Sequence, residues 1–370
     1  MAHQTIMAFL HQHHGGKHHD KDRDDDSDSD NEYTLTKSGQ PYTLSHKIYF
    51  IRKHDQIPVS PFHDIPLFHD KSKRIYNMFV EIPRWSQAKF EVCRSLPLNP
   101  ITQDTLSKTP SCPRFVPNLF PYKGYIWNYG ALPQTWESPH HSDRDTGKKG
   151  DNDPIDACEI GSRISYTGEV KRVKVLGILG LIDSGETDWK VLVIDVRDKL
   201  ADKLEDMEDV KKYCPGLMDA TRDWFRWYGV PEGRRPNKYA MGGRWRGRKY
   251  AEKVISECEE FWRELVKGKV KGSRDVSLTN TTLEGTPGKI DPKSVKLPPN
   301  EDLPPAEIGQ DLEEVAYVDR EKSDDEDEDD EEDDLTDDDD DNDDDDDWDD
   351  LTNDVALKDL KTMNINLNYW

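Results

Sequence analysis

The sequence has no long apolar run. The longest, Val175–Ile182, spans eight residues and contains two glycines, whereas a helix that crosses a bilayer needs about 20 apolar residues. The first residues also lack the charged-then-apolar order of a secretory signal and the Arg-rich, acid-poor composition of a transit peptide. We therefore expect no membrane segment and a cytoplasmic protein, with the nucleus as the alternative.

Cysteine is scarce and scattered. Five cysteines stand at Cys93, Cys112, Cys158, Cys214 and Cys258, an odd number without a CxxC pair. This pattern does not predict a disulfide framework and is typical of reduced thiols in an intracellular protein. No cysteine has an obvious base beside it in the sequence, so thiol catalysis is not predicted.

Positive charge is in short supply, with 51 Lys and Arg against 76 Asp and Glu and a net charge of −25. The deficit lies at the ends. Residues 319–354 hold 26 acids and two bases, residues 1–32 carry a net −5, and residues 33–318 are left with +3. The negative charge of the two ends repels the phosphates of nucleic acid, so direct binding of the whole chain to nucleic acid is not expected.

The composition divides the chain into five parts. Residues 1–32 hold six of the twelve histidines and predict a disordered His/Asp-rich arm, solvated or able to bind a transition metal. Residues 33–267 are the globular part. Residues 268–318 predict a Pro/Gly-bearing linker, and residues 319–354 a disordered poly-acidic tract. Residues 355–370 regain Leu, Ile, Tyr and Trp and predict a C-terminal segment that docks or stays free.

Apolar, β-branched runs predict strands over Ile75–Ile82, Val170–Leu179 and Trp189–Val196. A Ser-Gly turn within 183–188 separates the last two, which predicts a β-hairpin.

Helical patterns come later in the chain. Apolar residues recur at three- and four-residue spacing in Lys249–Lys267, and Leu217–Tyr228 is a second candidate helix. Because strands come first and helices last, the pattern favours an α+β fold over an alternating α/β sheet.

Acidic residues flank the most strand-like stretches. Asp151–Asp156 places three carboxylates within six residues, Asp183 and Asp188 follow, and Glu81 and Glu91 precede them. Carboxylate oxygens are hard ligands suited to Mg²⁺, Mn²⁺ or Ca²⁺. The loop is no EF-hand, because its sixth position lacks the required glycine. The alternative is an ordinary turn held by Asp and Asn side chains.

Cations accompany these acids. Lys89 lies two residues before Glu91, and Lys190 two residues after Asp188. On a strand, residues i and i+2 share a face, so each pair would present one cation and one anion to a common site. Arg114 adds a further cation. Acids that bind a metal, mixed with Lys and Arg, are what a phosphate-handling site requires.

The Asp151–Asp156 stretch resembles the signature of family I soluble inorganic pyrophosphatases of the eukaryotic type. Five further motifs resemble that family in the family's own order, within roughly Tyr33 to Lys267. They are Phe62–Leu67, Val80–Trp85, Phe120–Gly130, Pro133–Glu137 and Gly185–Lys190. The ordered set makes a chance match improbable.

The resemblance implies a five-stranded OB-like β-barrel with peripheral α-helices, flanked here by the disordered tails. It also implies hydrolysis of inorganic diphosphate to two orthophosphates by a metal-activated water, with Mg²⁺ as cofactor and Mn²⁺ as the alternative. Enzymes of the eukaryotic type are homodimers, so a homodimer is expected. No covalent nucleophile is needed, because a metal-bound water has a lowered pKa.

The resemblance also implies residue roles. Asp151, Asp156 and Asp188 match the principal metal ligands, while Asp183, Glu81 and Glu91 match acids that hold the remaining metals and waters. Asp153 matches the acid that accepts a proton from the attacking water. The residues that match phosphate-binding groups are Arg114, Lys89, Lys190, Tyr129 and Tyr228, and Tyr125 matches a tyrosine near the leaving group.

Two positions depart from the resembled family. Gly229 stands where the family usually has a phosphate-binding lysine, and Trp127 where it usually has a histidine. Arg234 or Arg235 is a candidate to replace the missing cation. Because the acids and the other cations are retained, we expect catalysis.

Two other functions stay open. In the first, the fold is a catalytically weakened relic and the acidic tail is an interaction module for a basic protein. In the second, the metal-dependent phosphohydrolase acts on polyphosphate or a nucleotide, although no Walker loop is present.

Overall fold

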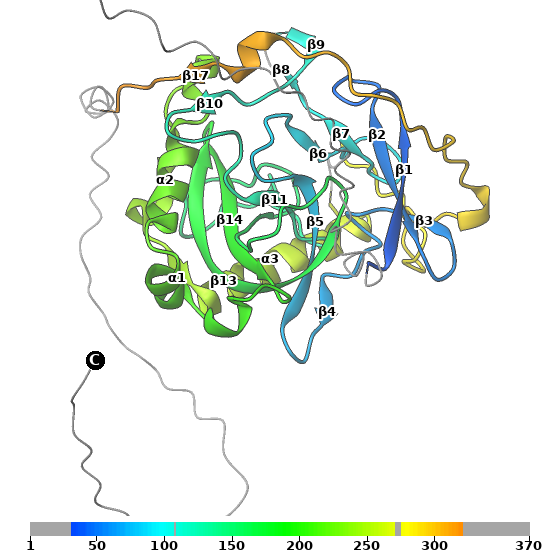
Figure 1. Cartoon of the computed structure of the whole chain (residues 1–370). Helices are drawn as coiled ribbons and strands as arrows, with labels where there is room; N and C mark the ends of the chain where they lie inside the picture. The colour runs from blue at the N-terminus through cyan, green and yellow to red at the C-terminus, as the bar shows by residue number, and fades with distance from the viewer. Residues whose placement is uncertain (1–30, 107–108, 271–274, 321–370) are drawn as a thin grey trace, which may run out of the picture. The chain divides into compact units, whose positions relative to one another are not determined.

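The predicted strands meet in one eight-stranded sheet of the computed structural model, which describes residues 31–106, 109–270 and 275–320 (Figure 1). Its main strands are β5 (Ile75–Ile82), β11 (Asn128–Ala131), β12 (Asp156–Glu159), β13 (Val170–Asp183) and β14 (Glu186–Asp195). The bounds of β5 match the prediction, while β13 extends to Asp183 and β14 begins earlier, at Glu186. β13 and β14 form the predicted hairpin.

The order of pairing brings the ends of this sheet together. It runs β13, β14, β12, β11 and β5, and β5 pairs again with β13. β12 and β14 are parallel and the other four pairings are antiparallel. Three short strands extend the sheet: β4 (Phe68–Asp70), β15 (Lys238–Tyr239) and β16 (Arg246–Gly247).

The two faces of β14 bury different sets of side chains. Val191 and Val193 pack in the apolar cluster that includes α3 (Arg248–Val266). Leu192 and Ile194 point the other way, into the larger core cluster. Because side chains alternate along a strand, Lys190 shares the face of Leu192, toward the interior of the sheet. This alternation positions the charged site described below.

A second, five-stranded sheet lies beside the first. Its strands are β1 (Tyr33–Ser38), β2 (Lys47–Arg52), β3 (Ile57–Val59), β6 (Phe90–Val92) and β7 (Ile101–Gln103). On β6, Phe90 and Val92 are buried and Glu91 between them is half-buried. Two short pairs complete the strands of the described region: β8 (Thr105–Leu106) with β9 (Thr109–Pro113), and β10 (Asn118–Leu119) with β17 (Val315–Ala316).

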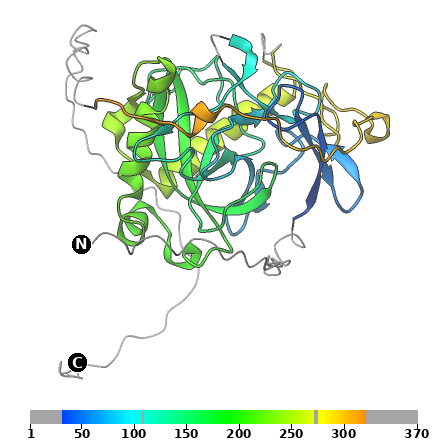
Figure 2. The same ribbon diagram turned by 45° about the horizontal axis from the view of Figure 1, so that its top comes forward.

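The helices that the described residues contain follow the strands, and both predicted helices are confirmed. They are α1 (Met207–Tyr213), α2 (Leu217–Trp227) and α3. The apolar stripe of α3 is buried from Ala251 to Val266, and Trp224 and Phe225 of α2 enter the core. Figure 2 shows α3 lying against the sheet. The fold is therefore mixed and sheet-rich with few helices, and the α+β class is confirmed at this level.

The predicted arm, the poly-acidic tract and the C-terminal segment lie outside the described residues, apart from 31–32 and 319–320. Among the described residues, no helix combines the length and apolar character needed to cross a bilayer.

The segment predicted as a linker, residues 268–318, packs against the body along its described residues. Val276 is buried, and the backbone and side chains of Thr281 and Thr282 donate hydrogen bonds to the buried carboxylate of Asp64. Within this segment, η5 (Pro292–Ser294) lies beside β3, and β17 pairs with β10 (Figure 1). Its low apolar content hid this packing, because polar contacts with distant residues provide much of the attachment.

His63 joins this segment to α3. Its Nδ1 accepts a hydrogen bond from Trp262 Nε1 at 3.0 Å, and its Nε2 lies 2.9 Å from the carbonyl oxygen of Ser277. Complete burial lowers the pKa of His63 to about 4, and the Ser277 carbonyl only partly offsets this effect. The folded protein therefore holds a neutral imidazole with both nitrogens engaged.

A pH-dependent loss of stability follows. The unfolded chain binds a proton at His63 below about pH 6.5, while the folded chain does so only near pH 4, so stability falls across this window by about 3 kcal/mol. Urea unfolding of the protein and of His63→Gln at several pH values measures the effect. The variant should be less stable at pH 7, and its deficit should shrink by about that amount at pH 4. A pH-independent deficit would contradict the assignment.

Candidate active site

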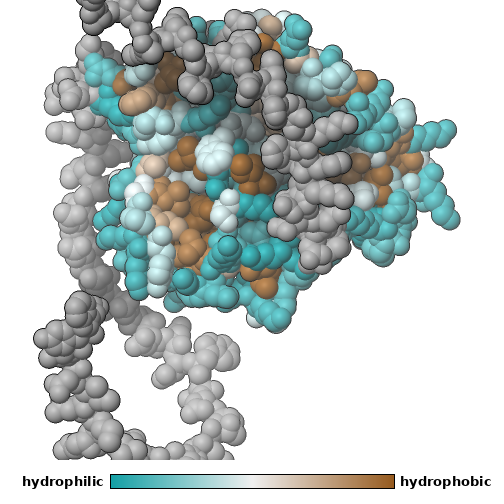
Figure 3. Space-filling view, in the orientation of Figure 1, coloured by the Kyte–Doolittle hydropathy of each residue, from teal (hydrophilic) through white to brown (hydrophobic). Residues whose placement is uncertain are grey.

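One cleft of about 480 Å³ gathers the side chains that the sequence singled out. All thirteen predicted site residues line it, although they are spread from Glu81 to Tyr228 in the chain. They are Glu81, Lys89, Glu91, Arg114, Tyr125, Tyr129, Asp151, Asp153, Asp156, Asp183, Asp188, Lys190 and Tyr228. The space-filling view shows apolar side chains gathered near the middle of one face of the molecule and hydrophilic ones along most of its margin (Figure 3).

The acidic loop owes its shape to local hydrogen bonds. Asp151 Oδ1 accepts from the backbone N–H of Asp153 at 3.0 Å, a turn that Asp side chains favour. Asn152 adopts a positive φ of 75°, and its Oδ1 accepts a hydrogen bond from Trp136 Nε1 at 2.9 Å. The loop is therefore both a turn and part of the acidic site, because the turn presents Asp151 and Asp153 to the cleft.

Lys190 occupies the centre of a charged group on two neighbouring strands. Its Nζ donates to Asp188 on the same strand and to Asp156 at the start of β12, which lies opposite it in register. It also donates to the hydroxyl of Tyr129 at 3.0 Å, and that hydroxyl donates to Asp156. Burial disfavours the ammonium charge, but Asp156 and Asp188 outweigh burial and raise the pKa of Lys190 well above its usual value.

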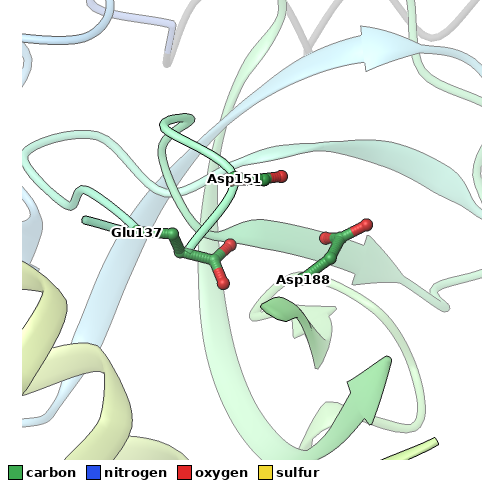
Figure 4. Close-up of side chains that lie close together, drawn as sticks. All are labelled: Glu137, Asp151 and Asp188. Atoms are coloured by element: carbon green, nitrogen blue, oxygen red, sulfur yellow. The ribbon is translucent and has the colours of Figure 1, made fainter. Parts of the chain in front are cut away.

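Three carboxylates form a tighter cluster, in which Asp151 and Asp188 line the cleft and Glu137 lies close to both. Oxygen atoms of Glu137, Asp151 and Asp188 all lie within 4.8 Å of one another. They come from three separate segments and gather around one small region (Figure 4). Burial, followed by repulsion from neighbouring acids, raises the pKa of Glu137 and Asp151 well above usual values, and burial does the same for Asp188.

Glu137 is one of the residues at this site that the sequence did not predict. Its Oε1 accepts a hydrogen bond from the backbone N–H of Trp189 at 2.9 Å. Its Oε2 is buried and has no hydrogen-bond partner among the described residues. A buried oxygen without a donor, beside two further acids, fits a hard divalent cation. Glu137 closes the Pro133–Glu137 motif, but one acid among aromatic residues carried no spacing signal of its own.

A second group of charges lies where the two sheets meet. Glu81, at the end of β5, is buried and accepts a hydrogen bond from the backbone N–H of Val92 at 2.7 Å. Burial and the charge of Asp156 raise the pKa of Glu81 well above its usual value. Lys89 Nζ lies 2.7 Å from Glu91 Oε2. The predicted pairing of a cation and an anion on β6 and its preceding residues is therefore present.

Arg114 is held by two acids. Its Nε and Nη2 donate to the two oxygens of Glu232 at 3.1 and 2.7 Å, and its Nη1 donates to Asp104 at 3.1 Å. This bidentate geometry fixes the guanidinium at the edge of the cleft. Neither acid was singled out from the sequence, because both belong to segments without a charge pattern.

Asp183 differs from the other acids of the site, because protein donors already surround it. Tyr228 donates its hydroxyl to Oδ2 at 2.6 Å, and Arg234 Nη1 donates to Oδ1 at 2.9 Å. Burial favours the neutral acid, but Arg234 and Tyr228 outweigh it and lower the pKa of Asp183. Asp183 is thus charged and paired on the side of the cleft formed by α2 and the loop after it.

Asp153 lies beside a cation that the sequence analysis did not assign. Arg94 Nη1 donates to Asp153 Oδ2 at 3.2 Å and to the carbonyl oxygen of Asp151 at 3.1 Å. Burial raises the pKa of Asp153 to about 7, although Arg94 opposes the shift. This carboxylate therefore exchanges protons near neutral pH.

Aromatic rings form the wall behind these charges. Tyr125 is buried and packs against Tyr129, with ring centroids 5.1 Å apart. Trp127 stacks on Phe225 at 4.8 Å and donates its indole N–H to Thr221 at 3.0 Å. Trp127 is fully buried in the core, so the departure at this position concerns packing.

Comparison with known sequences gives this cleft its context. A family model described as inorganic pyrophosphatase matches residues 78–263. The chain is 50% identical over 286 residues to an inorganic pyrophosphatase of Yarrowia lipolytica, covering 77% of this chain and 97% of that protein. It is 51% identical over 286 residues to one of Emericella nidulans, covering 77% and 98%. The chain belongs to the inorganic pyrophosphatase family.

Solved pyrophosphatases have similar structures. The enzyme of Schistosoma japonicum aligns with a TM-score of 0.69 and 43% identity, covering 77% of this chain and all of that one. A truncated vacuolar soluble pyrophosphatase of Trypanosoma cruzi in complex with PPi aligns with a TM-score of 0.58 and 37% identity, covering 72% and 99%. The resemblance drawn from the motifs is thereby confirmed at the level of the family.

The three-carboxylate cluster makes a prediction about metal binding. Glu137→Gln removes one charge from the cluster, so Mg²⁺ or Mn²⁺ should bind at least 10-fold more weakly. Without added metal the variant should be at least as stable as the parent, because a repulsive charge is gone. Calorimetric titration and thermal unfolding with and without Mg²⁺ measure both effects. Glu257→Gln, on the exposed side of α3, serves as the control; equal metal affinity in the Glu137 variant would refute the assignment.

Proposed function

We propose that the protein is an inorganic diphosphatase that hydrolyses diphosphate to two orthophosphates. The observation that carries the proposal is the cluster of Glu137, Asp151 and Asp188, of which Asp151 and Asp188 line one cleft together with Lys190. Membership in the pyrophosphatase family supports the choice of reaction. Acids and cations together in one cleft match a substrate that is a highly charged anion and binds with a divalent metal.

Mg²⁺ is the proposed cofactor, with Mn²⁺ as the alternative, because the available ligands are oxygens. Asp151, Asp156 and Asp188 are the proposed principal ligands, and the unpartnered oxygen of Glu137 adds a fourth. The remaining metal-associated acids in this proposal are Asp183, Glu81 and Glu91. When bound, such an ion lowers the pKa of a water and offsets phosphate charge.

The cations and hydroxyls of the cleft are proposed to bind the phosphates. Lys190 and Lys89 supply ammonium groups, Arg114 a guanidinium, and Tyr129 and Tyr228 hydroxyl donors. Tyr125 is proposed to lie near the leaving group. Because these groups are fixed by the ion pairs already described, they stabilise developing negative charge without being reoriented during the reaction.

Asp153 is proposed to accept the proton of the attacking water. A general base works best when its pKa lies near the working pH, and burial raises the pKa of Asp153 to about 7. Arg94 is proposed as the positioning residue that holds this carboxylate toward the cleft, through its contacts with Asp153 and with the Asp151 carbonyl.

Several broader expectations belong to the same proposal. The circuit of β13, β14, β12, β11 and β5 is proposed to be the five-stranded OB-like barrel. A homodimer is proposed, supported by exposed aromatic rings such as Phe120 and Tyr317, whose centroids lie 5.4 Å apart. The cytoplasmic location and a basic partner for the acidic tail remain predictions.

Substitution of the proposed base tests the reaction. Orthophosphate release from diphosphate should depend on Mg²⁺ and fall at least about 100-fold in kcat for Asp153→Asn, because the proton acceptor is lost. Asp202→Asn, an exposed aspartate on a short helix, is the matched control and should keep the full rate. The proposal fails if well-folded protein releases no orthophosphate, or if the Asp153 variant keeps its rate.

The competing functions predict different outcomes. Faster release from tripolyphosphate or ATP than from diphosphate would favour a different phosphohydrolase substrate.

The interaction-module alternative places the working part in the acidic tail, whereas the proposed site lies wholly within the described residues. A chain ending at residue 320 should therefore keep the kcat and KM of the full chain for diphosphate. Loss of activity in that shortened chain, with its folding intact, would favour a functional tail.

Truncation at residue 270 should behave differently. It removes Thr281 and Thr282 and leaves the buried Asp64 carboxylate without their hydrogen bonds. Loss of such partners destabilises a protein by at least a few kcal/mol. Thermal unfolding of the two truncated chains checks this point: the chain ending at 320 should melt like the full chain and the chain ending at 270 well below it. Equal melting would show that the segment contributes little.

A further inference from the structure

The loop after α2 brings Arg234 back to Gly229. Gly229 follows Tyr228 and precedes the short 3-10 helix η3 (Val230–Glu232). Gly233 then reverses the chain with a φ of 84°. The backbone N–H groups of Glu232 and Arg234 both donate to the carbonyl oxygen of Gly229 at 3.1 Å. The backbone of residue 234 therefore lies against residue 229, on the side of the cleft where Tyr228 and Asp183 meet.

Gly229 leaves room that the Arg234 side chain fills. A Cβ atom at residue 229 would lie 2.3 Å from Nε of Arg234 and 2.6 Å from its Nη2, far inside van der Waals contact. The guanidinium thus lies where a side chain of residue 229 would begin. Any larger residue at 229 would have to displace it, so the glycine and the arginine form a matched pair.

Only part of the guanidinium is used by the protein. Nη1 donates to Asp183 at 2.9 Å, and the Cζ atom lies 4.7 Å from the ring centroid of Tyr228. Nε and Nη2 are buried and have no hydrogen-bond partner among the described residues. The Glu232 oxygen nearest to Nε is 3.9 Å away, beyond hydrogen-bond distance.

Within the protein, Arg234 pairs with Asp183 through one nitrogen and packs its guanidinium on the ring of Tyr228. Buried donors without partners are costly and rare in folded proteins. Arg234 also lines the cleft together with Lys190 and Arg114. Two adjacent N–H donors on a planar, permanently charged group match the spacing of two phosphate oxygens.

We propose that Arg234 binds a phosphate group of the substrate beside Tyr228, and that Gly229 is required because it leaves the space in which the Arg234 guanidinium lies. This assignment rests on the proposed diphosphatase function and adds a specific substrate-binding residue to it. Arg235 is its natural comparison, since it is the next residue, is exposed and does not line the cleft.

Steady-state kinetics with diphosphate at saturating Mg²⁺ test the proposal on the full chain. Arg234→Ala should raise KM roughly 10- to 100-fold, the usual effect of losing a charge-assisted hydrogen bond. Arg234→Lys should recover part of that loss, because it keeps the charge but not the planar fork. Arg235→Ala should match the parent protein. Gly229→Ala should raise KM in the same direction, since its methyl group displaces the guanidinium.

A compensating variant adds a second line of evidence. The double variant Gly229→Lys with Arg234→Ala returns a cation to the vacated space from the other residue, and its KM should fall below that of Arg234→Ala alone. If Arg234 only holds Asp183 in place, its loss would instead raise the Mg²⁺ concentration needed for half-maximal rate and leave KM at saturating Mg²⁺ unchanged. That result, with the variant folded by thermal unfolding, would overturn the proposal.

The design separates this inference from the proposed function. If the parent protein hydrolyses diphosphate and both Arg234→Ala and Gly229→Ala keep its KM, the inference is wrong and the function stands. If the parent protein releases no orthophosphate in the presence of Mg²⁺, the proposed function fails, and the inference fails with it.

Discussion

Mutual repulsion among buried carboxylates is the constraint on which the site depends. Five acids in or next to the cleft have pKa values raised by burial: Glu81, Glu137, Asp151, Asp153 and Asp188. Lys190 and Lys89 offset part of this charge, and two of the acids, Glu81 and Asp188, are held on strands. What the protein leaves uncompensated, above all Glu137 Oε2, is where a divalent cation would lower the energy most.

The alternation of side chains along β14 connects that chemistry to the core. Val191 and Val193 pack toward α3, so the even-numbered residues of the strand point to the interior. Of these, Asp188 and Lys190 line the cleft, and Leu192 and Ile194 lie in the larger core cluster. A shift of one residue in register would bury the charges under α3 and expose the apolar set to the cleft. The same hydrophobic pattern that folds the sheet therefore orients the charged side chains of β14 toward the cleft.

Elements with a periodic hydrophobic pattern and sites with a local charge pattern could be predicted from the sequence. β5, the hairpin of β13 and β14, and α3 follow from hydrophobic spacing, and all thirteen predicted site residues line one cleft. Glu137, Arg94 and the Glu232 partner of Arg114 were missed, because their importance comes from contacts across the chain. The packing of the segment after α3 could not be predicted for the same reason, since its contacts with Asp64 are polar and join residues far apart in the chain.

Diffraction from crystals grown with Mn²⁺ shows directly whether the crowded carboxylates form a metal site. If they do, anomalous scattering peaks will lie among the oxygens of Glu137, Asp151 and Asp188, with Asp156 at or near the coordination sphere and Lys190 shifted away from the acids it now pairs with. Crystals in which the three carboxylates keep their present contacts, with no anomalous peak between them at saturating Mn²⁺, would contradict it.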